Sequence, residues 1–360
     1  MLGGCGRPRW YDLLVSFQQI DRLPFNRNPH GLVPERTLER NRPVYAQVTV
    51  VLLTFNCAHR LVPVLDHLRD LGLPTIAVDN ASVDHTVDVL RDRGDLEVIA
   101  LPVNIGAAGR NHGVQRAETP YVLFCDDDGW WQPEGLPAAV ALLDAHPRLA
   151  VVNARILVGE QGRLDAISVE MADSPLPERV GIPGAVLMSF MGGAVLIRRA
   201  AYLEVSGYDP VFFMGGEEET LAHKLVRRGW HLRYLPEMVM RHYPSVANAP
   251  HLRAQGMRNT LWNAWLHRRA FSAVRWTVFT LVDTPKNLDW LRGAAMAVKG
   301  IRWVARQRRP MSPQLDATLT VLDRRRFADR RSLFNRIDPV RSRGRDGQVE
   351  KTDQRTSSPR

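Results

Sequence analysis

From Val48 onward, the apolar residues of this chain form either short continuous runs or helix-spaced positions. Continuous apolar runs of about four to eight residues are typical of strands buried on both faces, and apolar residues three or four apart are typical of helices. Strands that alternate with helices indicate an α/β fold with a mostly parallel sheet covered on both faces. The pattern predicts strands at residues 48–55, 75–78, 96–101 and 121–125, and helices at residues 61–71, 86–93 and 109–117.

Composition divides the chain into four parts. Residues 1–45 are rich in Arg, Pro and Asn and form an N-terminal extension with one short helix predicted near residues 10–20. The α/β pattern fills residues 46–245, where a further strand is predicted at residues 194–197 and a helix at residues 217–228. Residues 246–335 place Trp and Leu at helical spacing and predict a C-terminal helical region, whereas the polar residues 336–360 predict a disordered tail.

Charge and cysteine content narrow the partners and the compartment. The formal net charge is +10, which favours acidic partners such as nucleotides, nucleic acid or anionic lipid. The chain has three cysteines, and they lack the paired spacing of metal ligands. We therefore expect no disulfide framework, and the reducing cytoplasm is the expected compartment. Charged residues interrupt residues 271–298 before the ~20 apolar residues that a span requires, so this segment could lie on the inner face of a membrane but not cross it.

Three consecutive acids close the strand predicted at residues 121–125. In parallel sheets, ligands bind beyond the carboxyl ends of the strands, and carboxylate oxygens there are the ligands that Mg²⁺ or Mn²⁺ prefers. If the chain stays extended, Asp126 and Asp128 face one ligand while Asp127 faces away. An acidic, solvated turn explains the same residues, since Asp and Gly favour turns.

Two other strand ends carry polar groups. Asp79 leaves a strand where its carboxylate could accept hydrogen bonds from a base or ribose, and helix capping explains Ser82 or Asp84 better than it explains Asp79. The turn at residues 104–111 is rich in small residues and opens a helix, so its backbone could approach an anion, and Arg110 adds a cation beside a diphosphate. Gly106 could equally serve the turn alone.

Acids also cluster about ninety residues after the triplet. Glu217, Glu218 and Glu219 follow two glycines at the start of a predicted helix, where one Glu could act as a general base. Acids in a first turn also suit the helix dipole, which is the structural alternative. His242 ends a later apolar stretch and is a candidate ligand for a metal or phosphate, although a lone His is more often structural.

Together these motifs resemble the family 2 glycosyltransferases, nucleotide-sugar enzymes of the GT-A fold. The resemblance runs from about Val48 to Tyr243, and each motif is loose, but their order and spacing together are specific. The segments that carry it are Val50–Asn56, Val78–Asp84, Asn104–Asn111, Phe124–Asp128, Met191–Ile197, Gly216–Leu221 and Gly229–Pro236.

The resemblance implies inverting transfer of a single sugar from a UDP-, dTDP- or GDP-linked donor to a glycan or lipid-linked acceptor, in cell-surface glycan or glycolipid synthesis, with a divalent cation (Mg²⁺ or Mn²⁺). Glu218 would be the base, beside Glu217, and no nucleic-acid partner is expected. The implied metal ligands are Asp126, Asp128 and His242. The implied nucleotide-sugar-binding residues are Thr54, Asn56, Asp79, Asn104, Gly106, Arg110, Asp126, Gly192 and Gly193.

Departures and alternatives remain. The family often has an acid and an Arg in the helix after the acidic pair, where this chain has Thr220 and Lys224, and the Gln-x-x-Arg-Trp signature of processive synthases is not evident. A metal-dependent nucleotidyltransferase would also use paired acids on a parallel sheet, and a basic nucleic-acid or membrane-surface module would explain the Arg-rich C-terminal half. The tryptophans among those arginines fit either an interfacial helix or a packed cap over the active site.

Overall fold

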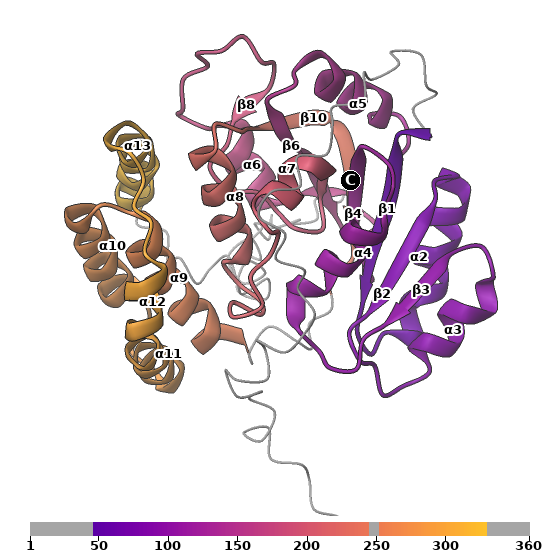
Figure 1. Ribbon diagram of the computed structural model, residues 1–360, viewed down its shortest axis with the longest axis horizontal. Coiled ribbons are helices and arrows are strands. Elements are labelled where there is room, and N and C mark those ends of the chain that lie inside the picture. The colour runs from indigo at the N-terminus through magenta and orange to yellow at the C-terminus, as the bar shows by residue number, and fades with distance from the viewer. Residues whose placement is uncertain (1–45, 245–251, 330–360) are drawn as a thin grey trace, which may run out of the picture. The chain divides into compact units, whose positions relative to one another are not determined.

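The computed structural model describes residues 46–244 and 252–329, and these contain one ten-stranded sheet with helices around it (Figure 1). The predicted N-terminal helix and the C-terminal tail lie outside the described residues. The strands run along the sheet in the order β3-β2-β1-β4-β9-β6-β10-β5, with β7 beside β6 and β8 beside β10. Their bounds are β1 Val48–Thr54, β2 Thr75–Asp79, β3 Glu97–Ala100, β4 Tyr121–Asp126, β5 Gly129–Trp131, β6 Leu149–Val158, β7 Arg163–Leu164, β8 Ala185–Val186, β9 Val195–Arg198 and β10 His231–His242.

The helices alternate with the strands in the first half and gather at the end of the described chain. A short 3-10 helix, η3, precedes α4. The bounds are α2 Ala58–Leu71, α3 Thr86–Arg93, η3 Gly106–Gly109, α4 Arg110–Arg116, α5 Leu136–Ala145, α6 Ala166–Ala172, α7 Arg199–Glu204, α8 Glu217–Arg227, α9 Arg253–His267, α10 Ala270–Asp283, α11 Leu288–Lys299, α12 Ile301–Gln307 and α13 Pro313–Asp329.

The first half of the sheet is parallel, as the sequence predicts. Strand β1 pairs in parallel with β2 on one side and β4 on the other, and β2 pairs in parallel with β3. All seven residues of β1 are buried, because alternate side chains enter two different apolar cores. Val50 and Leu52 pack on the face covered by α2 and α5, and Val51 and Leu53 pack on the face covered by α4 and α8.

The second half of the sheet is mixed. Strand β9 lies between β4 and β6 and runs antiparallel to both, and β5 runs antiparallel to β10. The run at residues 194–197, predicted to be a strand, lies in β9 from Val195 onward. Its apolar pattern could not indicate whether the strand runs parallel or antiparallel to its neighbours, because burial on both faces gives the same pattern in both cases. The chain reaches β9 through Gly193, which lies against Asp126 at the carboxyl end of β4, so β9 starts where β4 ends.

The helices that follow β10 form the C-terminal helical region. Helix α9 packs against α8, α10, α11 and α12. Trp262 of α9 joins Phe212, Leu266 and Val304 in a separate apolar cluster, and Trp276 of α10 is also buried. These two tryptophans therefore pack in the interior. Within the described residues, none of the helices has the length and apolar character needed to span a membrane.

Candidate active site

Thr54, Asn56 and Asp79 meet at the carboxyl ends of β1 and β2. The Asp79 carboxylate is 1 % exposed and accepts hydrogen bonds from Thr54 Oγ1 at 3.0 Å and from the Ser82 backbone N–H at 2.8 Å. Asn56 adopts a φ of 48°, and its Oδ1 accepts from the Val83 N–H at 2.9 Å. The three residues selected from the sequence thus build one rigid rim at the sheet's edge.

The turn at residues 104–107 forms the neighbouring part of this rim. Asn104 Oδ1 accepts from the Gly106 N–H at 2.8 Å, and Asn80 Nδ2 donates to the Gly106 carbonyl at 2.8 Å. Gly106 has a φ of 64°, and a Cβ there would lie 2.1 Å from the Phe213 carbonyl oxygen. Only glycine fits this position, for both backbone conformation and space.

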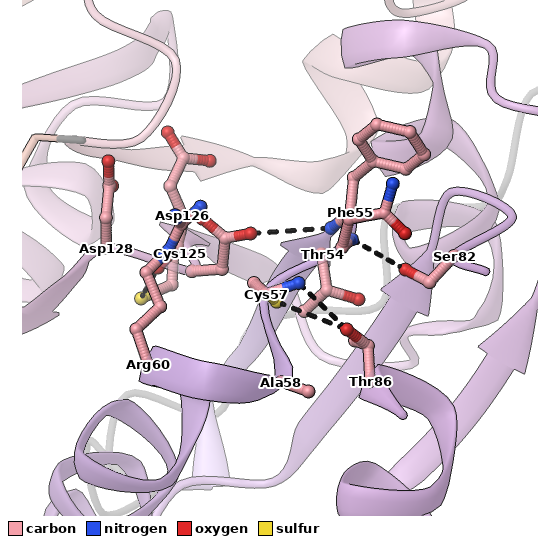
Figure 2. Close-up of polar contacts among 12 residues, drawn as sticks. Thr54, Phe55, Cys57, Ala58, Arg60, Ser82, Thr86, Cys125, Asp126 and Asp128 are labelled. Carbon is pink, nitrogen blue, oxygen red and sulfur yellow. Dashed lines mark hydrogen bonds and ion pairs between the residues drawn. The ribbon is translucent and has the colours of Figure 1, made fainter. Parts of the chain in front are cut away.

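The chain does not stay extended through the aspartate triplet, because β4 ends at Asp126, and Asp127 and Asp128 form the turn into β5. Figure 2 shows Asp126 and Asp128 extending to the same side of the strand end. Asp127 instead contacts the start of α2 and the residue before it: its Oδ1 lies 2.8 Å from Arg60 Nη2, and its Oδ2 accepts from the Phe55 N–H at 3.4 Å. Asp127 therefore ties the strand end to α2, and the other two acids stay together.

Arg110 forms an ion pair with Asp126. The guanidinium is buried, 5.6 Å from the ring centroid of Phe124 and 5.9 Å from that of Tyr208. Burial lowers the pKa of Arg110, but the negative charge of Asp126 and of nearby acids outweighs burial and raises it. Arg110 is thus a fixed cation at the carboxyl end of β4.

Asp128 and His242 lie opposite each other, 3.5 Å apart between Oδ1 and Nε2. Burial lowers the pKa of His242, and contact with Asp128 together with the charges of Asp126 and Asp165 reverses that effect and raises it. Asp128 Oδ1 is buried and accepts no hydrogen bond among the described residues. A carboxylate oxygen without a hydrogen bond, beside an imidazole, is a pair of ligands that suits a divalent cation. Residues 46–244 and 252–329 contain no group of three or more His, Cys, Asp or Glu side chains that could hold a metal ion together.

Glu217 and Glu218 open α8, near enough to Arg110 for their charges to act on its pKa. Burial and the neighbouring charge of Glu218 raise the pKa of Glu217 well above its ordinary value. Burial also raises the pKa of Glu218. Hydrogen bonds from the backbone of Glu218 and Gly192 and the positive charge of Arg110 partly offset this rise. A carboxylate with a raised pKa is a better proton acceptor, which is what a general base requires.

Two consecutive glycines connect the acids of β4 with those of α8. A Cβ on Gly193 would lie 2.3 Å from Asp126 Oδ2, and a Cβ on Gly192 would lie 3.0 Å from Glu218 Oε1. The segment between β8 and β9 thus passes between Asp126 and Glu218 and touches both. Asp126, which is paired with Arg110, and Glu218, whose pKa is raised, thus both lie against one short backbone segment.

The family model described as glycosyl transferase family 2 matches residues 49–205. This match covers less than half of the chain and makes that part similar to the family 2 glycosyltransferases. The chain is 29 % identical over 214 residues to the pre-mycofactocin glycosyltransferase of Mycobacterium tuberculosis, covering 56 % of this chain and 43 % of that protein. It is 31 % identical over 108 residues to the poly(ribitol-phosphate) beta-N-acetylglucosaminyltransferase TarS of Staphylococcus aureus, covering 27 % of this chain and 19 % of TarS. The chain thus spans less than half the length of these curated relatives.

Solved structures confirm the predicted GT-A fold. The structure of TarS 1–349 in complex with UDP-GlcNAc superposes with a TM-score of 0.51 at 15 % identity, covering 72 % of this chain and 83 % of that one. The mannosyltransferase PcManGT from Pyrobaculum calidifontis, in complex with GDP-Man and Mn2+, gives a TM-score of 0.50 at 18 % identity, covering 80 % and 81 %.

Sequence reasoning missed three residues that contribute to this candidate site. Tyr208 is buried beside Arg110, and its hydroxyl would lie 3.1 Å from a Cβ on Gly192, yet it stands in no motif. Asn259 and Asn263 belong to α9, outside the matched residues, and contact the turn before Glu217. The available signal was the spacing of the two asparagines, which lie four residues apart and so on one face of α9.

Proposed function

We propose that this chain transfers one sugar from a nucleoside diphosphate sugar to an acceptor hydroxyl, with inversion and with a divalent cation. The observation that carries the proposal is the contact of Gly192 and Gly193 with Glu218 and Asp126, respectively. It brings a candidate base close to the acid that would meet the donor's diphosphate. Such closeness suits a single displacement, in which acceptor and leaving group occupy opposite sides of one carbon.

In this reaction the acceptor hydroxyl gives its proton to Glu218, and its oxygen forms a bond to the anomeric carbon. The bond from that carbon to the diphosphate oxygen breaks, and its electron pair leaves with the nucleoside diphosphate. Arg110 stabilises negative charge near Asp126. A cation held by Asp128 and His242 would neutralise charge on the departing diphosphate.

The rim at β1 and β2 would hold the nucleoside. Thr54, Asn56 and Asp79 would contact the base and ribose, and Asn104 and Gly106 would approach the diphosphate through the backbone. The nucleotides in the neighbouring structures, UDP-GlcNAc in one and GDP-Man in another, support this class of donor. The acceptor class we propose is a glycan or lipid-linked glycan.

The test is turnover with a panel of UDP-, dTDP- and GDP-sugars in the presence of Mn²⁺, measured as nucleoside diphosphate release. Glu218→Gln should lower kcat by about 10²–10⁴-fold, because an amide cannot accept the proton. Asp128→Ala should lower activity and weaken its dependence on Mn²⁺. The product anomer, determined by NMR, should have the configuration opposite to the donor's.

Other outcomes would identify the alternatives. Release of pyrophosphate would make the chain a nucleotidyltransferase, because attack would then be at phosphorus. The transferase proposal would be contradicted if both variants kept the turnover of the wild type, or if the wild type turned over none of the donors. Either result would favour the basic binding module.

We also propose that α10–α12 rest on an anionic membrane surface. Phe271 and Val282 of α10 are 81 % and 72 % exposed, and further exposed apolar side chains follow on α11 and α12. Arg292, Lys299 and Arg302 are exposed on the same two helices, which supplies charge complementary to acidic lipid. Such a contact would place the enzyme beside a lipid-linked acceptor.

A further inference from the structure

Helix α9 lies directly on the glycine turn that leads into α8. Gly215 and Gly216 have φ values of 87° and 94°, a conformation that other residues rarely adopt. A Cβ on Gly216 would lie 3.2 Å from Asn263 Nδ2 and 3.3 Å from Asn259 Cβ. The glycines therefore permit both the sharp turn and the close approach of α9 to the acidic pair.

Asn259 contacts this turn at several points. It is completely buried, and its Nδ2 lies 2.6 Å from the Gly215 carbonyl oxygen and 2.8 Å from that of Phe212. Arg258 donates from Nε to Asn259 Oδ1 at 2.9 Å, which orients the amide, and from Nη2 to the Phe212 carbonyl at 3.2 Å. A buried amide with its donors and acceptor engaged has one preferred orientation.

Asn263 holds the last residue before the acids. Its Nδ2 donates to the Gly216 carbonyl at 2.7 Å, and its Oδ1 accepts a hydrogen bond from Thr220 Oγ1 in the first turn of α8. The side chain thus contacts the start of α8 on both sides of Glu217–Glu219. Rotation or sliding of the first turn of α8 would break both hydrogen bonds at once.

The same turn also reaches the rim proposed for the donor. The Phe213 carbonyl accepts a hydrogen bond from the Ala107 N–H at 2.8 Å, beside Gly106. The turn at residues 212–216 is therefore shared by α9, by the acidic pair and by the turn at residues 104–107. Its position sets where the acids of α8 lie relative to that rim.

We propose that Asn259 and Asn263 of α9 are positioning residues, whose amides hold the carbonyls of the 212–216 turn and so set where α8 presents Glu218. The inference rests on the proposed function, in which Glu218 is the base. It adds to that function a part for the C-terminal helical region, which lies outside the residues that the family model matches.

The experiment compares Asn263→Ala and Thr220→Val with the control Thr260→Ala. Thr220→Val keeps the side-chain volume and removes only the hydroxyl that Asn263 accepts from. Thr260 lies on the same helix, and its hydroxyl bonds to the Gly256 carbonyl within α9 at 2.9 Å, so the control tests a general effect on the helix. Steady-state kinetics, nucleoside diphosphate binding and amide hydrogen exchange are measured for each.

For Asn263→Ala we expect kcat to fall roughly tenfold to a hundredfold, because small displacements of a catalytic group are costly. The donor KM and the affinity for UDP or GDP should change less than about threefold, because Asn263 bonds to Gly216 and Thr220, whereas the 104–107 turn contacts Phe213. Amides of residues 213–220 should exchange faster, and the acidic limb of the pH–rate profile should move to lower pH as Glu218 gains solvent. Thr220→Val should show the same changes to a smaller extent.

Three results would overturn the proposal: an unchanged kcat in Asn263→Ala, unchanged exchange at residues 213–220, or an equal loss in Thr260→Ala. The exchange measurement needs no substrate. If wild-type protein turned over no sugar nucleotide, the proposed function would fail, while faster exchange confined to residues 213–220 would still show that the amides hold the turn.

Discussion

Gly193 allows a backbone segment to pass between two charged side chains. A methyl group there would lie 2.3 Å from Asp126 Oδ2, closer than any real contact, whereas one on Gly192 would lie 3.0 Å from Glu218 Oε1. Asp126 is also paired with Arg110, so displacing its carboxylate would disturb that ion pair. The two adjacent glycines therefore offer a matched comparison.

We expect Gly193→Ala to weaken nucleoside diphosphate binding by roughly tenfold or more, because it moves the carboxylate proposed to meet the donor. Gly192→Ala should leave that affinity nearly intact and act on kcat instead, since it touches Glu218. Isothermal titration with UDP or GDP and steady-state kinetics would measure both effects. Equal effects of the two variants on affinity would contradict this assignment.

Glu217 is a buried acid whose charge is costly. It is 4 % exposed, and its Oε2 has no hydrogen-bond partner among the described residues. Because burial raises its pKa in the folded state, its contribution to stability is fully present below the unfolded pKa of about 4.3 and is lost as pH rises through the folded value. A neutral amide of the same shape avoids that loss.

Glu217→Gln should therefore raise the free energy of unfolding at pH 8 by at least ~1 kcal/mol, with a smaller gain near pH 4. Denaturant unfolding at the two pH values would measure it. Glu219→Gln is the control, because Glu219 lies in the same turn with a side chain 22 % exposed. A gain that did not grow with pH would show that the charge of Glu217 is not the destabilising feature.

Among the elements, the turn before η3 depends on a contact from a distant segment. Gly94 and Gly106 have similar φ values, 69° and 64°, but a Cβ on Gly94 would meet nothing within 4 Å, whereas one on Gly106 would meet the Phe213 carbonyl at 2.1 Å. Substituting Gly94 and Gly106 in turn therefore separates the energetic cost of backbone strain from the cost of a steric clash.

Gly94→Ala should cost about 1 kcal/mol of stability, the price of a left-handed conformation for a residue with a Cβ. Gly106→Ala should cost ~2 kcal/mol more, because the 212–216 turn must also move. Thermal and urea unfolding would test this. Equal costs would mean that the 104–107 turn adapts without disturbing its neighbour.

Element boundaries show how much local pattern could predict. Residues 86–93 form α3 as predicted, since the local apolar spacing and Gly94 are sufficient signals. Helix α2 begins at Ala58, three residues before the predicted Leu61. Asp84, just before α3, accepts from the Ala58 N–H, and Thr86, the first residue of α3, accepts from the Cys57 N–H. Caps supplied from a distant segment leave no local pattern.

At the scale of the whole molecule, helices α10–α12 expose several large apolar side chains, which form a candidate contact surface. Phe271 and Val282 occupy the same exposed side of α10 as Val274 and Val278. Of the four tryptophans that suggested a membrane surface, Trp262 and Trp276 are buried, Trp290 is half-buried and Trp265 is 37 % exposed. Any membrane contact would therefore involve the aliphatic side chains and Phe271, with the basic residues of α11 and α12 around them.

The double variant Phe271→Ser/Val282→Ser should lower co-sedimentation with vesicles containing phosphatidylglycerol by roughly tenfold, since it removes buried apolar area at the interface. Vesicles of phosphatidylcholine alone should bind weakly. The control is Val180→Ser, because Val180 is exposed in the loop before β8. Binding that is equal for the double variant and the control would exclude this surface as the contact.

The sequence by itself determined the parallel half of the sheet, the acids at its carboxyl edge and the resemblance to family 2 glycosyltransferases, because buried runs, helical spacing and strand-end polarity are local properties. Only the tertiary structure decided that β9 runs antiparallel, that Asp126 faces Arg110, and that α9 holds the turn before Glu218. These features depend on contacts between residues that lie far apart in the chain, where one-dimensional spacing carries no information about direction or distance.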